Sequence, residues 1–243
     1  MKMLDNMKVL LDNMMAPVTF AWGFLEADLQ TAGNALLQWR QSHVKAVEMT
    51  AVAGLLQEVL HHLEPLSTPH RAELLLQTKS QWTAYFDNGA KGGDPTSAIG
   101  HLAQTMRCRG LAVTCVPHTL TQKDKNAKGT YGAVQFELFA PDRREFLNYE
   151  RSVSVVHDGN RWAFSAAGNV QPYEKSAQYS APKVRDRFTN AMLEEYCLAL
   201  KIRLFDPDFY GPKGLLLRVK DPLPVGFPIW SLKEAQEYFG IQH

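Results

Sequence analysis

The sequence predicts an α+β fold in which helices pack on a mixed, mainly antiparallel sheet, with residues 1–243 in a single domain. Apolar residues recur at helical spacing in some segments and alternate with polar residues in others. These segments do not follow the strict strand-helix-strand order of a parallel sheet, and an Asp-Gly step between two strand-like segments predicts a hairpin. A content of 45% hydrophobic and 21% charged residues is typical of a folded chain with a sizeable core.

The N-terminal residues are expected to be helical. Apolar residues at helical spacing predict a helix over residues 2–15 that ends before Pro17. A second helical pattern covers residues 22–39, although Gly33 is a poor helix former. Together these patterns leave open a small helical N-terminal subdomain over residues 1–42.

Two further helices follow from their apolar spacing and their end signals. Residues 52–63 repeat apolar side chains with the period of an amphipathic helix, and Pro65 is expected to end it. Another helix begins with Asp94 as N-cap and Pro95 at its first position, and it ends before Gly110.

The C-terminal helices are predicted mainly from their caps. Thr189 is the expected N-cap of a helix that runs to residue 200, and the apolar Phe188 before it fits a hydrophobic staple. Ser231 and Glu234 form a capping box for a last helix, and Gly240 lies where its left-handed C-cap is expected.

Alternating apolar residues predict strands between these helices. The predicted strands cover residues 82–86, 111–115, 134–138, 151–156, 161–165 and 214–219. Asp158 and Gly159 lie between the fourth and fifth of them and predict the hairpin turn. Residues 167–184 are rich in polar side chains and proline and predict a long loop, whereas residues 89–95 predict a shorter glycine-rich connection.

The distribution of charge argues against nucleic acid and membrane partners. The net charge is +1, and residues 1–121 carry nine Lys or Arg against ten Asp or Glu, so no basic face is expected. No stretch approaches the roughly 18 apolar residues of a membrane span. Asp5 and Asp12 interrupt the segment where a secretion signal would be apolar. We therefore expect a cytoplasmic protein.

The common sequence patterns of catalysis and metal binding do not occur. There is no G-x-S-x-G nucleophile turn, and Cys115 and His118 are three residues apart, which on a strand places them on opposite faces. His61 and His62 are adjacent, so on a helix they diverge by about 100° and cannot readily share an ion. We predict no catalytic, cofactor-binding or metal-binding residues.

Two weaker patterns are explained by turn and cap chemistry. Residues 90–97 resemble a phosphate loop, but Lys91 precedes both glycines and Asp94 supplies negative charge where a phosphate would lie. Asp206 and Asp208 flank a proline, which is typical of a turn rather than of a cation site.

Aromatic and acidic residues occur together in two segments and predict a surface for a protein partner. Aromatic side chains supply contact area, and carboxylates supply steering and register. In the first segment, Trp82 and Phe86 are expected to face the core, whereas the environment of Tyr85 stays open. The predicted partner-binding residues are Tyr85, Asp87, Asn88, Asp206, Asp208, Phe209 and Tyr210.

Three short segments carry a resemblance to a known group of proteins. They read SQWTAYFDNG at residues 80–89, HLAQTMRCRGLAV at 101–113 and LFDPDFYG at 204–211. This pattern resembles uncharacterised bacterial proteins that are similar to the immunity partners of Rhs-type and other polymorphic toxins. The resemblance implies a non-enzymatic cytoplasmic protein that binds a cognate toxin directly and occludes its active site.

Two alternatives remain open at the level of sequence. One is a hydrolase-type enzyme whose site is assembled by the fold from scattered residues such as Asp87, His101, His118 and Asp208. The other is a structural component that self-associates through the apolar face of residues 52–63. The oligomeric state is not predicted by any of these patterns.

Overall fold

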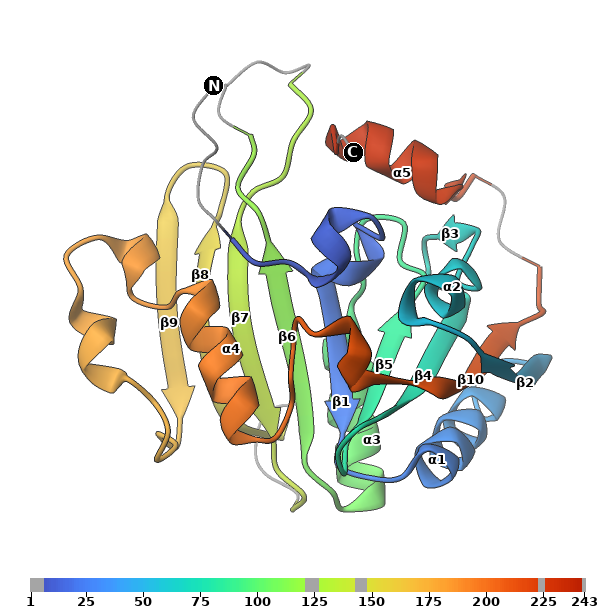
Figure 1. Ribbon diagram of the computed structural model, residues 1–243. Coiled ribbons are helices and arrows are strands. Elements are labelled where there is room, and N and C mark those ends of the chain that lie inside the picture. Colours follow the sequence, from blue (N-terminus) through green and yellow to red (C-terminus); the bar gives the residue numbers. More distant parts are fainter. Residues whose placement is uncertain (1–6, 121–126, 143–147, 223–225, 242–243) are drawn as a thin grey trace.

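One nine-stranded sheet dominates the computed structural model, which describes residues 7–120, 127–142, 148–222 and 226–241 (Figure 1). The strands follow the order β2 (Val47–Ala53), β10 (Tyr210–Val219), β4 (Ala72–Thr78), β5 (Thr83–Asp87), β1 (Ala21–Leu25), β6 (Gly110–Val116), β7 (Ala133–Phe139), β8 (Tyr149–His157) and β9 (Trp162–Gly168). All the pairings between these strands are antiparallel. A two-stranded sheet pairs β11 (Ile229–Trp230) with β3 (Leu66–Ser67).

Helices cover both faces of the large sheet, so the predicted α+β class is confirmed. The described helices are α1 (Leu29–Gln41), α2 (Leu56–His61), α3 (Pro95–Met106), α4 (Asn190–Ala199) and α5 (Leu232–Phe239). α1 and α3 pack on one face, and α2, α4 and part of α5 share a second apolar core on the other face. α5 lies beyond the strand ends at one end of the sheet (Figure 1). No helix in the described ranges combines the length and apolar character needed to cross a membrane.

Three predicted helices are confirmed close to their expected bounds because their end signals are local. Thr189 caps α4 by accepting a hydrogen bond from the amide of Met192. The capping box of α5 forms as expected, and Gly240 ends that helix with a φ of 66°. α3 starts at Pro95, although the side chain of Asp94 makes no capping hydrogen bond.

The prediction of a helix over residues 52–63 is wrong in its first part. Val52 belongs to the edge strand β2, where it pairs with Gly214 of β10. The chain leaves that strand at Gly54, whose φ of 153° is accessible to glycine, and α2 begins only at Leu56. Pairing with a strand far along the chain therefore overrides the local helical period.

The N-terminal region departs most from its predicted helices. Leu11 and Asp12 have left-handed backbone angles within the short 3-10 segment Leu10–Asn13, so no regular helix forms over the described residues 7–15. Residues 21–25 form β1, the middle strand of the sheet, and only residues 29–41 are helical. The described part of residues 1–42 thus contributes a central strand and the covering helix α1.

All six predicted strands are present, and the hairpin at residues 158–159 joins β8 to β9. The strands that the sequence did not reveal are β1, β2, β4 and the short β3 and β11. β4 carries Leu74, Leu75 and Leu76, which are all fully buried because each face of the sheet is covered. A strand buried on both faces lacks the alternation by which strands are recognised.

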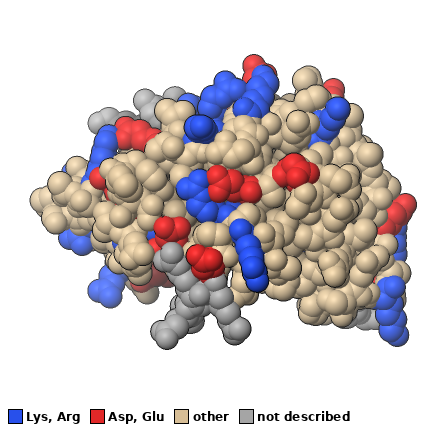
Figure 2. Space-filling model, turned by 90° about the horizontal axis from the view of Figure 1, so that it is seen from below, with Lys and Arg blue, Asp and Glu red and all other residues tan. Residues whose placement is uncertain are grey.

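The long loop predicted over residues 167–184 corresponds to the connection of residues 169–189 between β9 and α4, which contains the 3-10 turns η3 (Ser176–Ser180) and η4 (Val184–Asp186). Two further 3-10 turns lie at η2 (Val18–Phe20) and η5 (Pro207–Phe209). Charges of both signs are scattered over the face in Figure 2, which shows no large area of one sign.

Candidate functional site

The seven predicted partner-binding residues do not form a common exposed surface. Tyr85, Asp87, Asn88, Phe209 and Tyr210 are at most 5% exposed, and only Asp206 and Asp208 reach solvent. Tyr85 points to the face opposite Phe86, and it is fully buried because α1 and α3 cover that face. A buried side chain offers no contact area to a partner.

Hydrogen bonds explain why these polar residues are inside the fold. The Tyr85 hydroxyl donates to Glu73, and the two carboxylate oxygens of Asp87 accept from the amides of Gly89 and Asp94. The Asn88 side chain joins three backbone groups, accepting from the amides of residues 71 and 72 and donating to the carbonyl of residue 65. These residues hold the fold together.

The second predicted segment is a turn that packs on the core. The Tyr210 hydroxyl accepts from the indole of Trp22 and donates to the carbonyl of Leu204. Asp206 caps the turn η5 by accepting from the amide of Asp208, and it also pairs with Arg203 at 2.7 Å. The interpretation of these two aspartates as turn residues is confirmed.

The scattered residues of the enzyme alternative lie in different places. Asp87 is buried at the start of the connection to α3, and His101 stacks on Trp39 with ring centroids 4.4 Å apart. Asp208 is exposed in η5, whereas His118 lies at the far end of β6. The fold does not bring them to one cavity among those described below.

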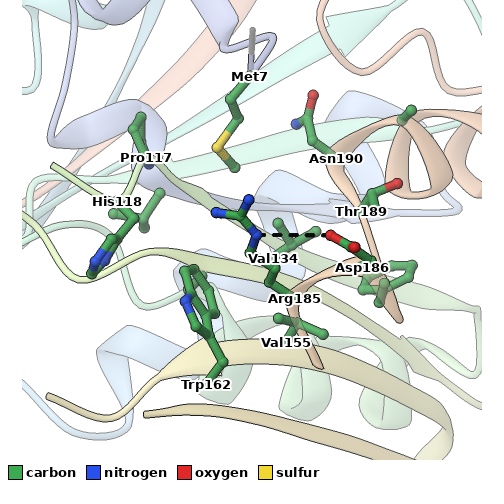
Figure 3. A pocket seen from close by; sticks show the side chains of 14 residues that line it. Met7, Pro117, His118, Val134, Val155, Trp162, Arg185, Asp186, Thr189 and Asn190 are labelled. Atoms are coloured by element: carbon green, nitrogen blue, oxygen red, sulfur yellow. Dashed lines mark ion pairs between the residues drawn. The ribbon is translucent and has the colours of Figure 1, made fainter. Parts of the chain in front are cut away.

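His118 lines a cavity of about 360 Å³ at the ends of strands β6 to β9, which we call the His118 cavity (Figure 3). Its lining residues are Met7, Val116, Pro117, His118, Ala133, Val134, Val155, Trp162, Arg185, Asp186, Phe188, Thr189, Asn190 and Ala191. Arg185 extends into the middle of it and pairs with Asp186 at 3.8 Å. The walls are mainly apolar, so the cavity suits an apolar group.

Polar side chains of the His118 cavity already form hydrogen bonds with backbone groups of the fold. The Nδ1 of His118 accepts from the amide of Gly132, which places the proton of the neutral imidazole on Nε2. Burial and the nearby His157 and Arg185 lower the pKa of His118. Thr189 uses its hydroxyl oxygen to cap α4. Among the described lining residues, no nucleophile is therefore paired with a basic histidine nitrogen.

The segment that resembles a phosphate loop lines a second cavity, of about 520 Å³. Lys91 and Asp94 lie in its wall with the side chains of Phe20, Tyr131 and Phe239. Lys91 is exposed, and the connection from residue 89 to residue 94 is fixed by the carboxylate of Asp87. The segment is therefore the loop that leads into α3, and the carboxylate of Asp87 holds its backbone in place.

Metal-ligating and thiol groups are dispersed. Within the described ranges, no group of three or more His, Cys, Asp or Glu residues is placed to hold a metal ion. Cys108, Cys115 and Cys197 are free, as expected for reduced thiols. Burial raises the pKa of Cys108 to about 11 and that of Cys115 to about 12, so both are protonated at neutral pH.

A third cavity, of about 310 Å³, is the most cationic of the three, and we call it the Arg71 cavity. Its lining residues are Pro65, Ser67, Arg71, Asn88, Arg218, Val219, Lys220, Asp221 and Ile229. It lies where the small β3–β11 sheet meets the ends of β4 and β10. No sequence motif marks this cavity, because Arg71 and Arg218 are far apart in the chain and come together only through the pairing of β4 with β10.

Ile229 connects this cavity to a group of exposed apolar residues. Phe227, Ile229 and Tyr238 are 46%, 54% and 51% exposed. Trp230 is half-buried and packs on Tyr238 with ring centroids 5.0 Å apart. We call Phe227, Ile229, Trp230 and Tyr238 the C-terminal apolar surface; Trp230 and Tyr238 are in contact, whereas Ile229 precedes Trp230 on β11 and points to the other side of that strand. The cluster of apolar residues just before the capping box was the available signal for it.

Comparison of the chain with models of protein families, with curated proteins and with solved structures found no match.

Proposed function

We propose that the protein is a non-enzymatic binding protein, an immunity protein that neutralises a cognate bacterial toxin by binding it directly and covering its active site. The observation that carries this proposal is the C-terminal apolar surface, with three large side chains about half exposed within twelve residues. Aromatic residues are enriched at protein interfaces, and they supply most of the binding energy where they lie in the centre of one.

The backbone under this surface is well fixed, which favours a binding role. The capping box of Ser231 and Glu234 anchors the start of α5, and the Gln236 side chain donates to the carbonyl of Met14 at 2.9 Å. Leu232 and Ala235 are buried on the inner side of the helix. A preformed surface loses little conformational entropy on binding, so more of the contact energy appears as affinity.

The toxin as partner is supported by the three segments that resemble immunity proteins, at residues 80–89, 101–113 and 204–211. Much of their sequence forms core strands, a helix and a turn, so the resemblance concerns the scaffold more than the binding surface. Binding by occlusion needs a shaped surface and no catalytic groups.

Co-expression with the product of the adjacent gene tests the proposal. We expect rescue of growth and a complex that survives purification, with an affinity near the nanomolar range, about −12 kcal/mol. Tyr238→Ala should weaken the complex by roughly 30-fold, since loss of a central aromatic residue costs about 2 kcal/mol.

Leu198→Ala is the matched control, because Leu198 is 57% exposed on the outer side of α4. It should leave the complex unchanged. Absence of both growth rescue and a complex would contradict the proposal that the adjacent gene encodes a toxin partner. Equal effects of the two substitutions on the complex would show that the C-terminal apolar surface is not the binding surface.

A further inference from the structure

The two edges of the nine-stranded sheet differ in what lies beside them. At one edge, the 3-10 turn η4 packs against β9. At the other edge, β2 pairs with β10 on one side, and no strand among the described residues pairs with its other side. Figure 1 shows β2 at the outer margin of the molecule. β2 is therefore an open edge, where backbone groups can accept another strand.

The hydrogen bonds that flank β2 show which of its backbone groups point outwards. The amide of Lys220 donates to the carbonyl of Ala46, and the amide of Gly54 donates to the carbonyl of Pro212. Hydrogen-bonded and non-hydrogen-bonded pairs alternate along an antiparallel ladder, so the even-numbered residues of β2 bond to β10. The residues that direct their N–H and C=O groups away from β10 are Val47, Met49, Ala51 and Ala53.

β2 lacks the features by which edge strands usually avoid pairing with other chains. It has seven residues, contains no proline and keeps one register along β10. Its single charged residue is Glu48, and the carboxylate of Glu48 is already paired with Lys220 at 2.6 Å. Leu55, which lies two residues beyond the strand, is 73% exposed and adds an apolar side chain at the end of this edge.

We propose that β2 is a self-association surface, on which β2 of a second copy of this chain pairs in antiparallel orientation about a two-fold axis at Thr50. This register pairs all seven residues of both strands. It joins the outward backbone groups of Val47 to those of Ala53, and the outward groups of Met49 to those of Ala51. The inference does not rest on the proposed function.

The side chains of β2 favour this register over a shifted one. With the axis at Thr50, Glu48 lies opposite Val52, so no like charges meet. The two Thr50 side chains face each other, which is a favourable cross-strand pair. An axis at Glu48 would place two carboxylates opposite each other and would pair fewer residues. Because one strand supplies both halves of the interface, a second copy is a complementary partner for this edge.

Sedimentation equilibrium of the full chain tests the proposal. We expect a reversible dimer with a dissociation constant in the micromolar range, since pairing along one edge buries a small area. Thr50→Lys should weaken the dimer at least about 10-fold, because two lysines would meet at the two-fold axis. Thr50→Glu should weaken it similarly, and mixing the two variants should restore association through opposite charges.

Ser165→Lys is the matched control, because Ser165 is exposed at the middle of β9, the opposite edge strand. It should leave the dimer unchanged. Circular dichroism of each variant checks that the fold is kept. A dimer that survives Thr50→Lys, or that Thr50→Lys and Ser165→Lys weaken equally, would overturn the proposal.

Hydrogen exchange of the unsubstituted protein provides a second test that needs no variant. The amides of Met49 and Ala51 should exchange more slowly as the protein concentration rises, whereas the amide of Thr50, which bonds to β10, should not change. A protein that stays monomeric up to roughly 1 mM would overturn the proposal. So would a monomer whose complex with the product of the adjacent gene is weakened by Thr50→Lys, because the edge would then bind a toxin strand instead.

Discussion

Arginines occupy two kinds of environment in this protein: some pair with buried carboxylates, and one keeps a buried nitrogen without a partner among the described residues. In the interior, Arg151 and Arg40 each meet a buried carboxylate, so the fold supplies both partners of each pair. At the Arg71 cavity, Arg218 lies opposite Glu48 across the β2–β10 pairing, whereas the buried Nη2 of Arg71 has no hydrogen-bond partner among the described residues. The same residue type thus meets a buried carboxylate in one region and keeps a buried donor unpaired among the described residues in the other.

The pair of Arg151 and Glu174 is the most buried of these. Their side chains are 4% and 0% exposed, and two hydrogen bonds of 2.8 and 2.7 Å join them. Glu174 also accepts from the Tyr179 hydroxyl and the amide of Gln171. Because Glu174 lies in the long connection after β9, this network fastens that connection to the sheet.

The largest effect is expected for Arg151→Met, which leaves the carboxylate of Glu174 buried without its counter-charge. We expect a loss of about 3–5 kcal/mol in the free energy of unfolding, measured by urea denaturation. The double substitution Arg151→Met with Glu174→Gln should recover part of this loss, because no unpaired charge then remains buried. A loss below about 1 kcal/mol for the single substitution would contradict the structural role.

Arg40→Met should have the next largest effect. Arg40 binds Glu73 through bonds of 2.7 and 2.6 Å, and Glu73 also accepts from Tyr85 beneath α1. Arg40 is 18% exposed, so water can partly replace it, and we expect a loss of about 2–3 kcal/mol. Thermal denaturation of this variant beside Arg151→Met gives the ranking, and the reverse order would contradict it.

A smaller and pH-dependent effect is expected at the half-exposed pair of Arg109 and Glu26. The hydrogen bonds from Arg109 lower the pKa of Glu26 below its ordinary value of 4.5. A carboxylate with a lowered folded-state pKa adds stability above its unfolded pKa and loses it as the pH falls through the folded value. Arg109→Gln should therefore lower the free energy of unfolding by up to about 1 kcal/mol at pH 7.

The pH dependence provides the check on that prediction. The difference between Arg109→Gln and the unsubstituted protein should shrink as the pH falls below 4.5. Melting curves of both proteins, recorded about every pH unit between roughly pH 3 and pH 7, measure this difference. If the stability difference instead grows as the pH falls, the prediction for the Arg109–Glu26 pair is wrong.

Arg71→Gln should have the smallest effect on stability. Its Nη2 atom has no hydrogen-bond partner among the described residues, so the free energy of unfolding should stay within about 0.5 kcal/mol or rise slightly. The same urea denaturation as for Arg151→Met measures it. A loss comparable to that of Arg40→Met would mean that Arg71 is a structural residue and would remove the contrast between the two regions.

The sequence predicts this fold where the signals are local. Thr189, Ser231 and Gly240 fix helix ends through contacts within a few residues, and the Asp158–Gly159 turn fixes a hairpin in the same way. The sequence did not reveal β2 because its partner strand lies about 160 residues later in the chain. It did not reveal β1 because Trp22 and Leu25 continue the helical spacing of the apolar residues in α1.

Gly33 illustrates why such positions mislead. A Cβ atom at residue 33 would lie 2.4 Å from Cδ1 of Leu215, so any other residue there would displace the Leu215 side chain where α1 approaches β10. Sequence patterns interpret it as a weak point in a helix. Arg71 was missed for a related reason, since its lack of a partner depends on what surrounds it in three dimensions.

The order of strands in the sheet also constrains how the chain acquires its structure during synthesis. β6, β7, β8 and β9 are neighbours both in sequence and in the sheet, so this half can pair as it emerges from the ribosome. β2 must wait for β10, whose last paired residue is Val219, before its pairing is complete. The Arg71 cavity, whose lining runs from Pro65 to Ile229, is therefore completed only after residue 229 has been synthesised.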